Sequence, residues 1–226
     1  MPGEPVVILH VALTEAVATS ISGLVKGHRR VRGAQGEVWG GQEGEEREDR
    51  VAAAIFYSVT STQAGLAGIE LGTHLIKGAV ASLAREFPAL ATFSTLSPIP
   101  GFRAWLLLLL TKAARGEAPC PLAPELVERA GAALGVQGEG EVCGALAALL
   151  RSSAWVGSST EPLLAELLPR LAARYLYREK RRRAALCPVA NFHIRNGACL
   201  WRVNWMADPS PRGMEASCGL MVNYRY

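Results

Sequence analysis

The stretch FSTLSPIPGF, from Phe93 to Phe102, joins a hydroxyl-rich strand end to the start of a helix through two prolines and a glycine. Proline fixes its own φ and pushes the preceding residue toward extended geometry, so Ser97 and Ile99 are both restricted. We therefore predict that Ser97 is held on a rigid bend. Turns also use Ser, Pro and Gly for geometry alone, so an incidental serine in a strand-to-helix turn remains the alternative.

The residues before this stretch predict strands separated by helices. Buried-type strands are predicted at Val6–Leu13, Val51–Val59 and Leu90–Leu96. Thr14 is a suitable N-cap for a short helix to about Val25. A second helix carries apolar residues at a period of about 3.6 and ends near Phe87, before Pro88. The lysine-, arginine- and glutamate-rich segment 26–50 between them is predicted to be a disordered loop, most simply a solvated linker.

The residues after Phe102 are predicted to be mainly helical. The expected helices are Phe102–Ala114, Pro124–Leu134, Glu141–Leu150 and Pro162–Glu179, and we interpret 102–183 as a helical insertion. Pro188 suits the first turn of another helix. Asn196-Gly197 suits either the C-terminal cap of that helix or a two-residue hairpin turn, with a strand at Ala198–Met206 in both cases. The fold class is therefore α+β or α/β.

Bulk composition favours a globular protein. Half of the 226 residues are hydrophobic, 19% are charged, and the net charge of +4 is too small to indicate nucleic-acid binding. The apolar run Trp105–Leu110 is far shorter than the roughly 20 residues that span a bilayer, so no membrane segment is expected. Five dispersed cysteines without a CxxC pair indicate neither a zinc site nor a disulfide framework.

Three long motifs together resemble malonyl-CoA decarboxylases. They are FSTLSPIPGF itself, AGIELGTHLIKG (Ala67–Gly78) and PVANFHIRNGACLWRVNWMAD (Pro188–Asp208). The likeness continues, in family order, through REFPAL, SSAWV, RYLYREK and the final CGLMVNYRY. The resemblance implies one catalytic domain over residues 1–226 with the GNAT acyltransferase fold. That fold is α+β with three-layer α/β character, an acyl-CoA-binding mixed sheet with flanking helices.

The resemblance also implies the site residues. Gly68 and Gly72 flank a predicted helix start, where backbone N–H groups favour an anion, although such a turn also serves geometry alone. The family likeness makes this loop the coenzyme A contact, comprising Ala67, Gly68, Ile69, Glu70, Leu71, Gly72 and Thr73. It likewise implies that Ser97 binds the malonyl carboxylate and accepts a proton, while His193 donates one. Without it, His193 between Phe192 and Ile194 is more typical of a packed, hydrogen-bonded core histidine than of a catalytic one.

Tyr226 ends the last matched motif and is expected either to donate a hydrogen bond to this site or to pack. The implied reaction is decarboxylation of malonyl-CoA to acetyl-CoA and CO2, in fatty acid metabolism. The thioester accepts the electrons, so no cofactor and no metal are expected. The partners are malonyl-CoA and acetyl-CoA, with a homo-oligomer expected because the family is oligomeric.

The chain departs from the family pattern at both ends. The N-terminal helical oligomerisation domain is expected to be absent, and the chain ends at Tyr226, before the tail of animal members. Family members occupy the mitochondrial matrix, peroxisome or cytoplasm, and the absence of a targeting signal here favours the cytoplasm for this form. Two alternatives remain open: a GNAT-type acyl-CoA N-acyltransferase, and an inactive form that binds acyl-CoA or modulates an oligomer.

Overall fold

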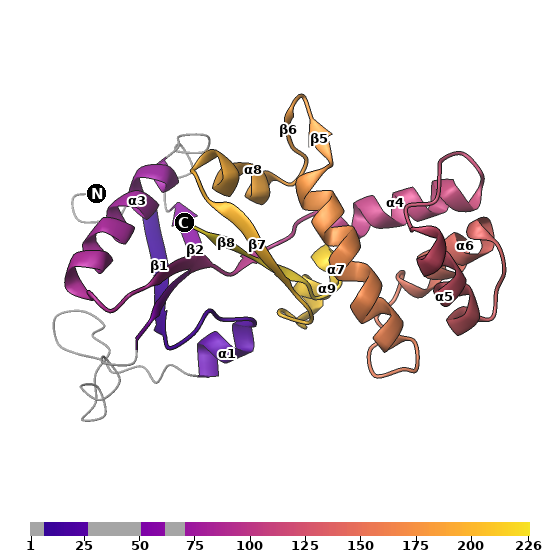
Figure 1. Cartoon of the computed structure of the whole chain (residues 1–226), viewed down its shortest axis with the longest axis horizontal. Helices are drawn as coiled ribbons and strands as arrows, with labels where there is room; N and C mark the ends of the chain where they lie inside the picture. Colours follow the sequence, from indigo (N-terminus) through magenta and orange to yellow (C-terminus); the bar gives the residue numbers. More distant parts are fainter. Residues whose placement is uncertain (1–6, 27–50, 62–70) are drawn as a thin grey trace. The chain divides into compact units, whose positions relative to one another are not determined.

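A computed structural model describes residues 7–26, 51–61 and 71–226, with α+β architecture (Figure 1). The side chains of 26, 60, 61 and 71–74 are outside this description. The strands are β1 (Val7–Thr14), β2 (Ala53–Ser61), β3 (Thr92–Thr95), β4 (Ser97–Pro98), β5 (Lys180–Arg181), β6 (Ala184–Ala185), β7 (Cys199–Asn204) and β8 (Met221–Arg225). The helices are α1 (Ile21–Lys26), α3 (Leu71–Glu86), α4 (Phe102–Ala114), α5 (Pro124–Leu134), α6 (Glu139–Leu149), α7 (Glu161–Tyr177), α8 (Pro188–Arg195) and α9 (Pro211–Ser217).

The described residues form two compact units. The first contains those up to Ser97 together with His193–Arg202 and Val222–Tyr226, and the second contains Pro98–Phe192 and Val203–Met221. The mixed sheet has the order β1-β2-β3-β8-β4, and β7 pairs with β8. β1 and β2 are antiparallel, β2 and β3 are parallel, and β3 and β8 are antiparallel.

The core of the first unit forms where apolar strand residues meet α3. The run Ala53–Phe56 of β2 is buried, as expected for a strand between two neighbours. α3 packs against β1, and its Ile76 is buried. From the centre of the sheet, β8 adds the buried side chains of Val222 and Tyr224. This arrangement buries the end of β3 and the start of β4, including the polar side chains of Thr95 and Ser97.

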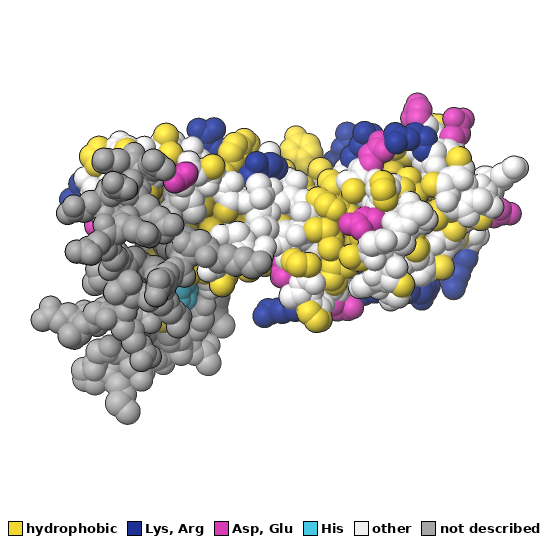
Figure 2. All heavy atoms as spheres, turned by 90° about the horizontal axis from the view of Figure 1, so that it is seen from below, with side chains coloured by type: hydrophobic (Ala, Val, Ile, Leu, Met, Phe, Trp, Pro, Cys, Tyr) yellow, Lys and Arg dark blue, Asp and Glu magenta, His cyan; other side chains and the backbone are white. Residues whose placement is uncertain are grey.

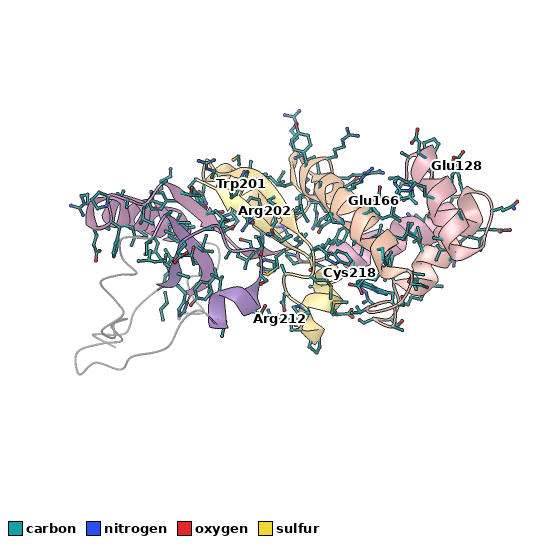
Figure 3. The ribbon with its side chains drawn as sticks, turned by 60° about the horizontal axis from the view of Figure 1, so that its bottom comes forward. Glu128, Glu166, Trp201, Arg202, Arg212 and Cys218 are labelled. Atoms are coloured by element: carbon teal, nitrogen blue, oxygen red, sulfur yellow. The ribbon has the colours of Figure 1, made fainter. Side chains whose placement is uncertain are left out.

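The second unit is built from helices. α4 packs against α6, α7 and α9, because Phe102, Leu106 and Leu110 recur at helical spacing and are fully buried. Glu166 of α7, labelled in Figure 3, accepts a hydrogen bond from Arg129 Nη1 of α5 at 2.7 Å. Figure 2 shows hydrophobic and charged side chains interspersed on one face of the described residues. No helix among residues 7–26, 51–61 and 71–226 is long and apolar enough to cross a membrane.

Several predicted elements are confirmed. α4 and α5 have the predicted bounds, and α6 and α7 begin one or two residues earlier than expected. Gly197 has φ +87°, and Ala198 N–H donates to the carbonyl of His193, so Asn196-Gly197 ends a helix rather than forming a hairpin turn. The mixed α+β class is also confirmed. The predicted loop 26–50 falls, apart from Lys26, outside the described residues and stays a prediction.

Other details differ from prediction. Thr14 does not cap a helix; its hydroxyl donates to the carbonyl of Ala16, and α1 begins only at Ile21, where Ser20 Oγ accepts from Gly23 N. Thr14 is the last residue of β1 and pairs with Ala53, so the chain is still extended there and no helix begins at it. The basic run after α7 forms a small hairpin, β5–β6, which contains Arg182 and Arg183 at positive φ. α9 and β8 were not predicted.

Candidate active site

Ser97 lies at the bend between the sheet and α4. The chain leaves β3, passes through Ser97 and Pro98 in β4, and enters α4 after Gly101, which has φ +78°. Glycine adopts this φ readily, whereas other residues do so only with strain. Ser97 is 6% exposed. Ser97 therefore lies at the predicted bend and is buried there, while its rigidity stays a prediction.

His193 reaches Ser97 from a segment 96 residues later in the chain. It lies in the last turn of α8, where Pro188 begins the helix and Gly197 follows its end. Its imidazole Nε2 is 3.2 Å from Ser97 Oγ, and the residue is 6% exposed. The structure therefore brings together the two side chains that the resemblance implied as catalytic.

A third and a fourth side chain extend this contact into a hydrogen-bonded row. The phenol of Tyr226 lies 2.8 Å from the other imidazole nitrogen, Nδ1 of His193. On the opposite side, Ser97 Oγ donates to Thr95 Oγ1 at 2.8 Å. The row therefore consists of four side chains from separate elements. Tyr226 follows β8, His193 is in α8, Ser97 is in β4 and Thr95 is in β3. Tyr226 is a hydrogen-bond neighbour of the histidine, which was one of its two expected roles.

Proton counting assigns the tautomer of His193. A serine hydroxyl has a single proton, and that of Ser97 is used toward Thr95, so Ser97 Oγ faces the imidazole as an acceptor. Nε2 must then bear the ring proton. Burial lowers the pKa of His193 from 6.5 to about 4, so the ring is neutral at pH 7 and Nδ1 accepts from Tyr226.

The aromatic neighbours hold the imidazole plane in place. The ring of Tyr224 stacks on that of His193 with centroids 4.5 Å apart and an interplanar angle of 24°, while Tyr226 approaches it edge-on. Burial raises the pKa of the Tyr226 phenol to about 12. This hydroxyl therefore remains protonated at neutral pH and available as a donor to Nδ1.

Thr95 is fixed by contacts that sequence reasoning missed. Its Oγ1 also accepts from Tyr224 N at 3.1 Å, and its carbonyl accepts from Asn223 Nδ2 at 2.6 Å. Arg202 of β7, labelled in Figure 3, donates a hydrogen bond from Nε to Asn223 Oδ1 at 3.2 Å. A signal was present, because residues two apart in an extended strand share a face. Thr95 with Ser97, and Tyr224 with Tyr226, both have that spacing.

The predicted coenzyme A loop is not tested by these contacts. Ala67, Gly68, Ile69 and Glu70 lie outside the described residues. Leu71, Gly72 and Thr73 begin α3, and their side chains are not described. Within the described ranges, no three His, Cys, Asp or Glu side chains are arranged to hold a metal ion. An open hollow of about 700 Å³ between α5 and α6, lined by residues such as Val127 and Gly131, contains neither Ser97 nor His193.

Comparisons with known proteins match the whole chain. Residues 1–226 match the family model described as malonyl-CoA decarboxylase C-terminal domain. The chain is 49% identical to the mitochondrial malonyl-CoA decarboxylase of Mus musculus, covering 100% of this chain and 43% of that protein. It is 46% identical to the mitochondrial malonyl-CoA decarboxylase of Anser anser anser, covering 100% of this chain and 42% of that protein. The chain therefore spans less than half the length of these curated relatives.

Solved structures give the same result. The malonyl-CoA decarboxylase of Cupriavidus metallidurans superposes with a TM-score of 0.74 at 34% identity, covering 100% of this chain and 50% of that one. The malonyl-CoA decarboxylase of Rhodopseudomonas palustris superposes with a TM-score of 0.72 at 33% identity, covering 98% of this chain and 43% of that one.

Proposed function

This chain belongs to the malonyl-CoA decarboxylase family, and from that premise we propose that it binds malonyl-CoA and removes its free carboxylate as CO2. The observation that carries the proposal is the 3.2 Å contact between Ser97 Oγ and His193 Nε2, supported behind the ring by Tyr226. The mitochondrial names of the curated relatives support a mitochondrial location for the chain.

The proposed reaction breaks one carbon–carbon bond and forms one carbon–hydrogen bond. The electron pair of the bond to the carboxylate moves onto the thioester carbonyl, CO2 departs, and an enolate of acetyl-CoA remains. A proton then adds to the enolate carbon. Because the thioester itself receives the electrons, the proposal requires no electron-accepting cofactor. The protein has to orient the carboxylate and supply the proton.

His193 is the proposed proton donor. Its neutral ring carries a proton on Nε2, and an enolate carbon is basic enough to take it. As Nε2 loses this proton, Nδ1 can take one from Tyr226, so the imidazole passes from one neutral tautomer to the other. Solvent then supplies a proton to Nε2 while the Nδ1 proton returns to Tyr226, which restores the starting tautomer. A positioned general acid contributes roughly two to four powers of ten in rate.

Ser97 is the proposed contact for the malonyl carboxylate. Its hydroxyl proton, which points to Thr95, can turn to the carboxylate. Its oxygen can also accept a hydrogen bond from Nε2–H, which holds the imidazole until the substrate carbon arrives. In this part of the proposal, Ser97 binds the carboxylate and is the hydrogen-bond acceptor for the proton donor. A fixed donor at a developing oxyanion contributes about 3 to 4 kcal/mol, which sets the scale of the expected loss in S97A.

The test measures CO2 released from malonyl-CoA labelled in its free carboxylate, with the 226-residue chain and no amine present. The wild type should release label, and H193N should lose roughly two to four powers of ten in rate. I194A changes an exposed neighbour on the same helix and is the matched control. A near-normal rate in H193N would contradict the assigned role.

Two other results would favour the alternatives. Malonyl-CoA binding in calorimetry without any CO2 release by the wild type would support an acyl-CoA-binding form. Transfer of the acyl group to an added amine, with no CO2 release in its absence, would support an acyltransferase.

A further inference from the structure

Two of the five cysteines are in contact inside the helical second unit. Cys120 Sγ and Cys143 Sγ are 3.4 Å apart, although 23 residues separate them in the chain. Both are free thiols in the structure. A disulfide bond is about 2.05 Å long, so the sulfurs need to approach by only about 1.4 Å to form one. The dispersed spacing of the cysteines gave no indication of this pair.

The two thiols differ in access. Cys120 lies in the connection between α4 and α5 and is partly exposed, whereas Cys143 lies on α6 and is fully buried. Burial, followed by the contact with Cys120, raises the pKa of Cys143 to about 12. Because Cys120 is the more exposed of the two thiols, a reagent in solution meets it first. Cys143 is then placed to attack whatever Cys120 has become.

We propose that Cys120 and Cys143 form a site of reversible thiol oxidation, in which a small disulfide such as glutathione disulfide is the oxidant. The Cys120 thiolate attacks one sulfur of the glutathione disulfide, breaks its S–S bond and releases one glutathione thiolate. Cys143 gives up its proton and attacks Cys120 Sγ, which expels the second glutathione. Two electrons pass from the cysteines to the two glutathiones, which also take up the two protons.

The new bond would join the α4–α5 connection to α6. At present this connection is held by weaker contacts, including the buried side chain of Leu122 and a 3.4 Å hydrogen bond from Arg174 Nη1 to the carbonyl of Pro121. A covalent link across it restricts the unfolded chain more than the folded one. Oxidation is therefore expected to raise the thermal midpoint of unfolding, and a reductant to reverse the rise.

Peptide mapping tests the proposal on the 226-residue chain. The folded protein is incubated with glutathione disulfide, quenched with an alkylating reagent, denatured and digested with trypsin without reduction. Arg115, Arg129 and Arg151 bound two tryptic peptides, 116–129 and 130–151, each with one cysteine of the pair. The expected product is these two peptides joined, lighter by two hydrogen atoms than their sum and separated by dithiothreitol.

Variants assign the order of attack. C143S should stop at a glutathione adduct on Cys120, and C120S should show neither the cross-link nor an adduct on Cys143. C199S changes an exposed cysteine on β7 and should keep the cross-link. Circular dichroism checks that C143S is folded. If C143S is not folded, the order of attack is tested with C120S alone, because that substitution lies at a partly exposed position. Full alkylation of both cysteines in the treated and then denatured wild type, or a stable glutathione adduct on its Cys120, would overturn the proposal.

Discussion

The phenol of Tyr226 and the imidazole of His193 are joined at Nδ1, on the side of the ring away from Ser97. This contact is consistent with the tautomer assigned from the Ser97–Thr95 hydrogen bond, in which Nε2 bears the proton. With Tyr226 donating to Nδ1, the Nε2 proton points to Ser97 and, under the proposed function, to the substrate. The tyrosine acts through the histidine and is therefore a positioning residue.

We expect Y226F to lower kcat about tenfold with little change in KM, because a lost hydrogen bond of about 1.4 kcal/mol corresponds to that factor. Nitrogen NMR of the His193 imidazole should show a smaller population of the Nε2–H tautomer in Y226F than in the wild type. Y177F removes a phenol from a residue that is 71% exposed and is the matched control. An unchanged tautomer together with an unchanged kcat would show that Tyr226 only packs.

The Thr95 hydroxyl should matter for stability as well as for the site. T95V removes the acceptor of two buried donors, Ser97 Oγ and Tyr224 N. Leaving a buried donor without a partner costs about 1 to 3 kcal/mol of stability. We expect the free energy of unfolding in urea to fall by about 2 to 4 kcal/mol. T95S keeps the acceptor and should restore most of it. Equal stability of T95V and T95S would contradict the hydrogen-bonded role.

His193 should make the stability of the protein depend on pH. Its pKa is about 4 in the folded state and 6.5 ordinarily, so between these values the unfolded chain binds a proton that the folded chain does not. Stability therefore falls as the pH drops from 6.5 toward 4, and it is fully present above 6.5. From pH 7 to 4.5 the loss due to this residue is about 2 to 3 kcal/mol.

The measurement is urea unfolding at both pH values for the wild type and H193Q, which has no titrating group at this position. The difference between the two pH values should be smaller in H193Q by that amount. Parallel pH dependence in the two proteins would mean that the imidazole is not buried as the structure has it.

The β5–β6 hairpin has a turn that its own residues do not favour. Arg182 and Arg183 have φ of +49° and +69°, in the region where glycine and asparagine are preferred. Both arginines are exposed, so replacing them removes little packing. We expect the double variant R182N/R183G to raise the free energy of unfolding by about 0.5 to 1 kcal/mol in urea titrations. R178G changes a nearby exposed arginine at φ −94° and should be destabilising or neutral instead.

Local sequence signals predicted the long elements well. Pro124 and Gly135 bound α5, and apolar residues at helical spacing mark α4. Both helices could therefore be predicted without information from the rest of the protein. The unpredicted elements are short. β8 has only five residues, and β5 and β6 have two each, too few for a periodic pattern to be distinguished from a loop.

The site could be predicted only in part, because its residues come from separate segments. The prediction of a rigid bend at Ser97 rested on Pro98 and Pro100, which lie close to it in the sequence. Its pairing with His193 is a tertiary contact, which only the family likeness suggested. The support from Asn223 and Thr95 depends on β8 lying beside β3, and no local pattern contains that information.

The hydrogen bonds that hold the site span long stretches of chain, and this bears on when the site can form. Asn223 Nδ2 donates to the carbonyl of Ala18 across 205 residues, and Thr95 Oγ1 accepts from Tyr224 N across 129. Such non-local contacts form slowly, and a chain leaving the ribosome presents its N-terminal part first. During synthesis, Thr95 and Ser97 are therefore made long before the strand that fixes them, so the Ser97–His193 contact is among the last features to form.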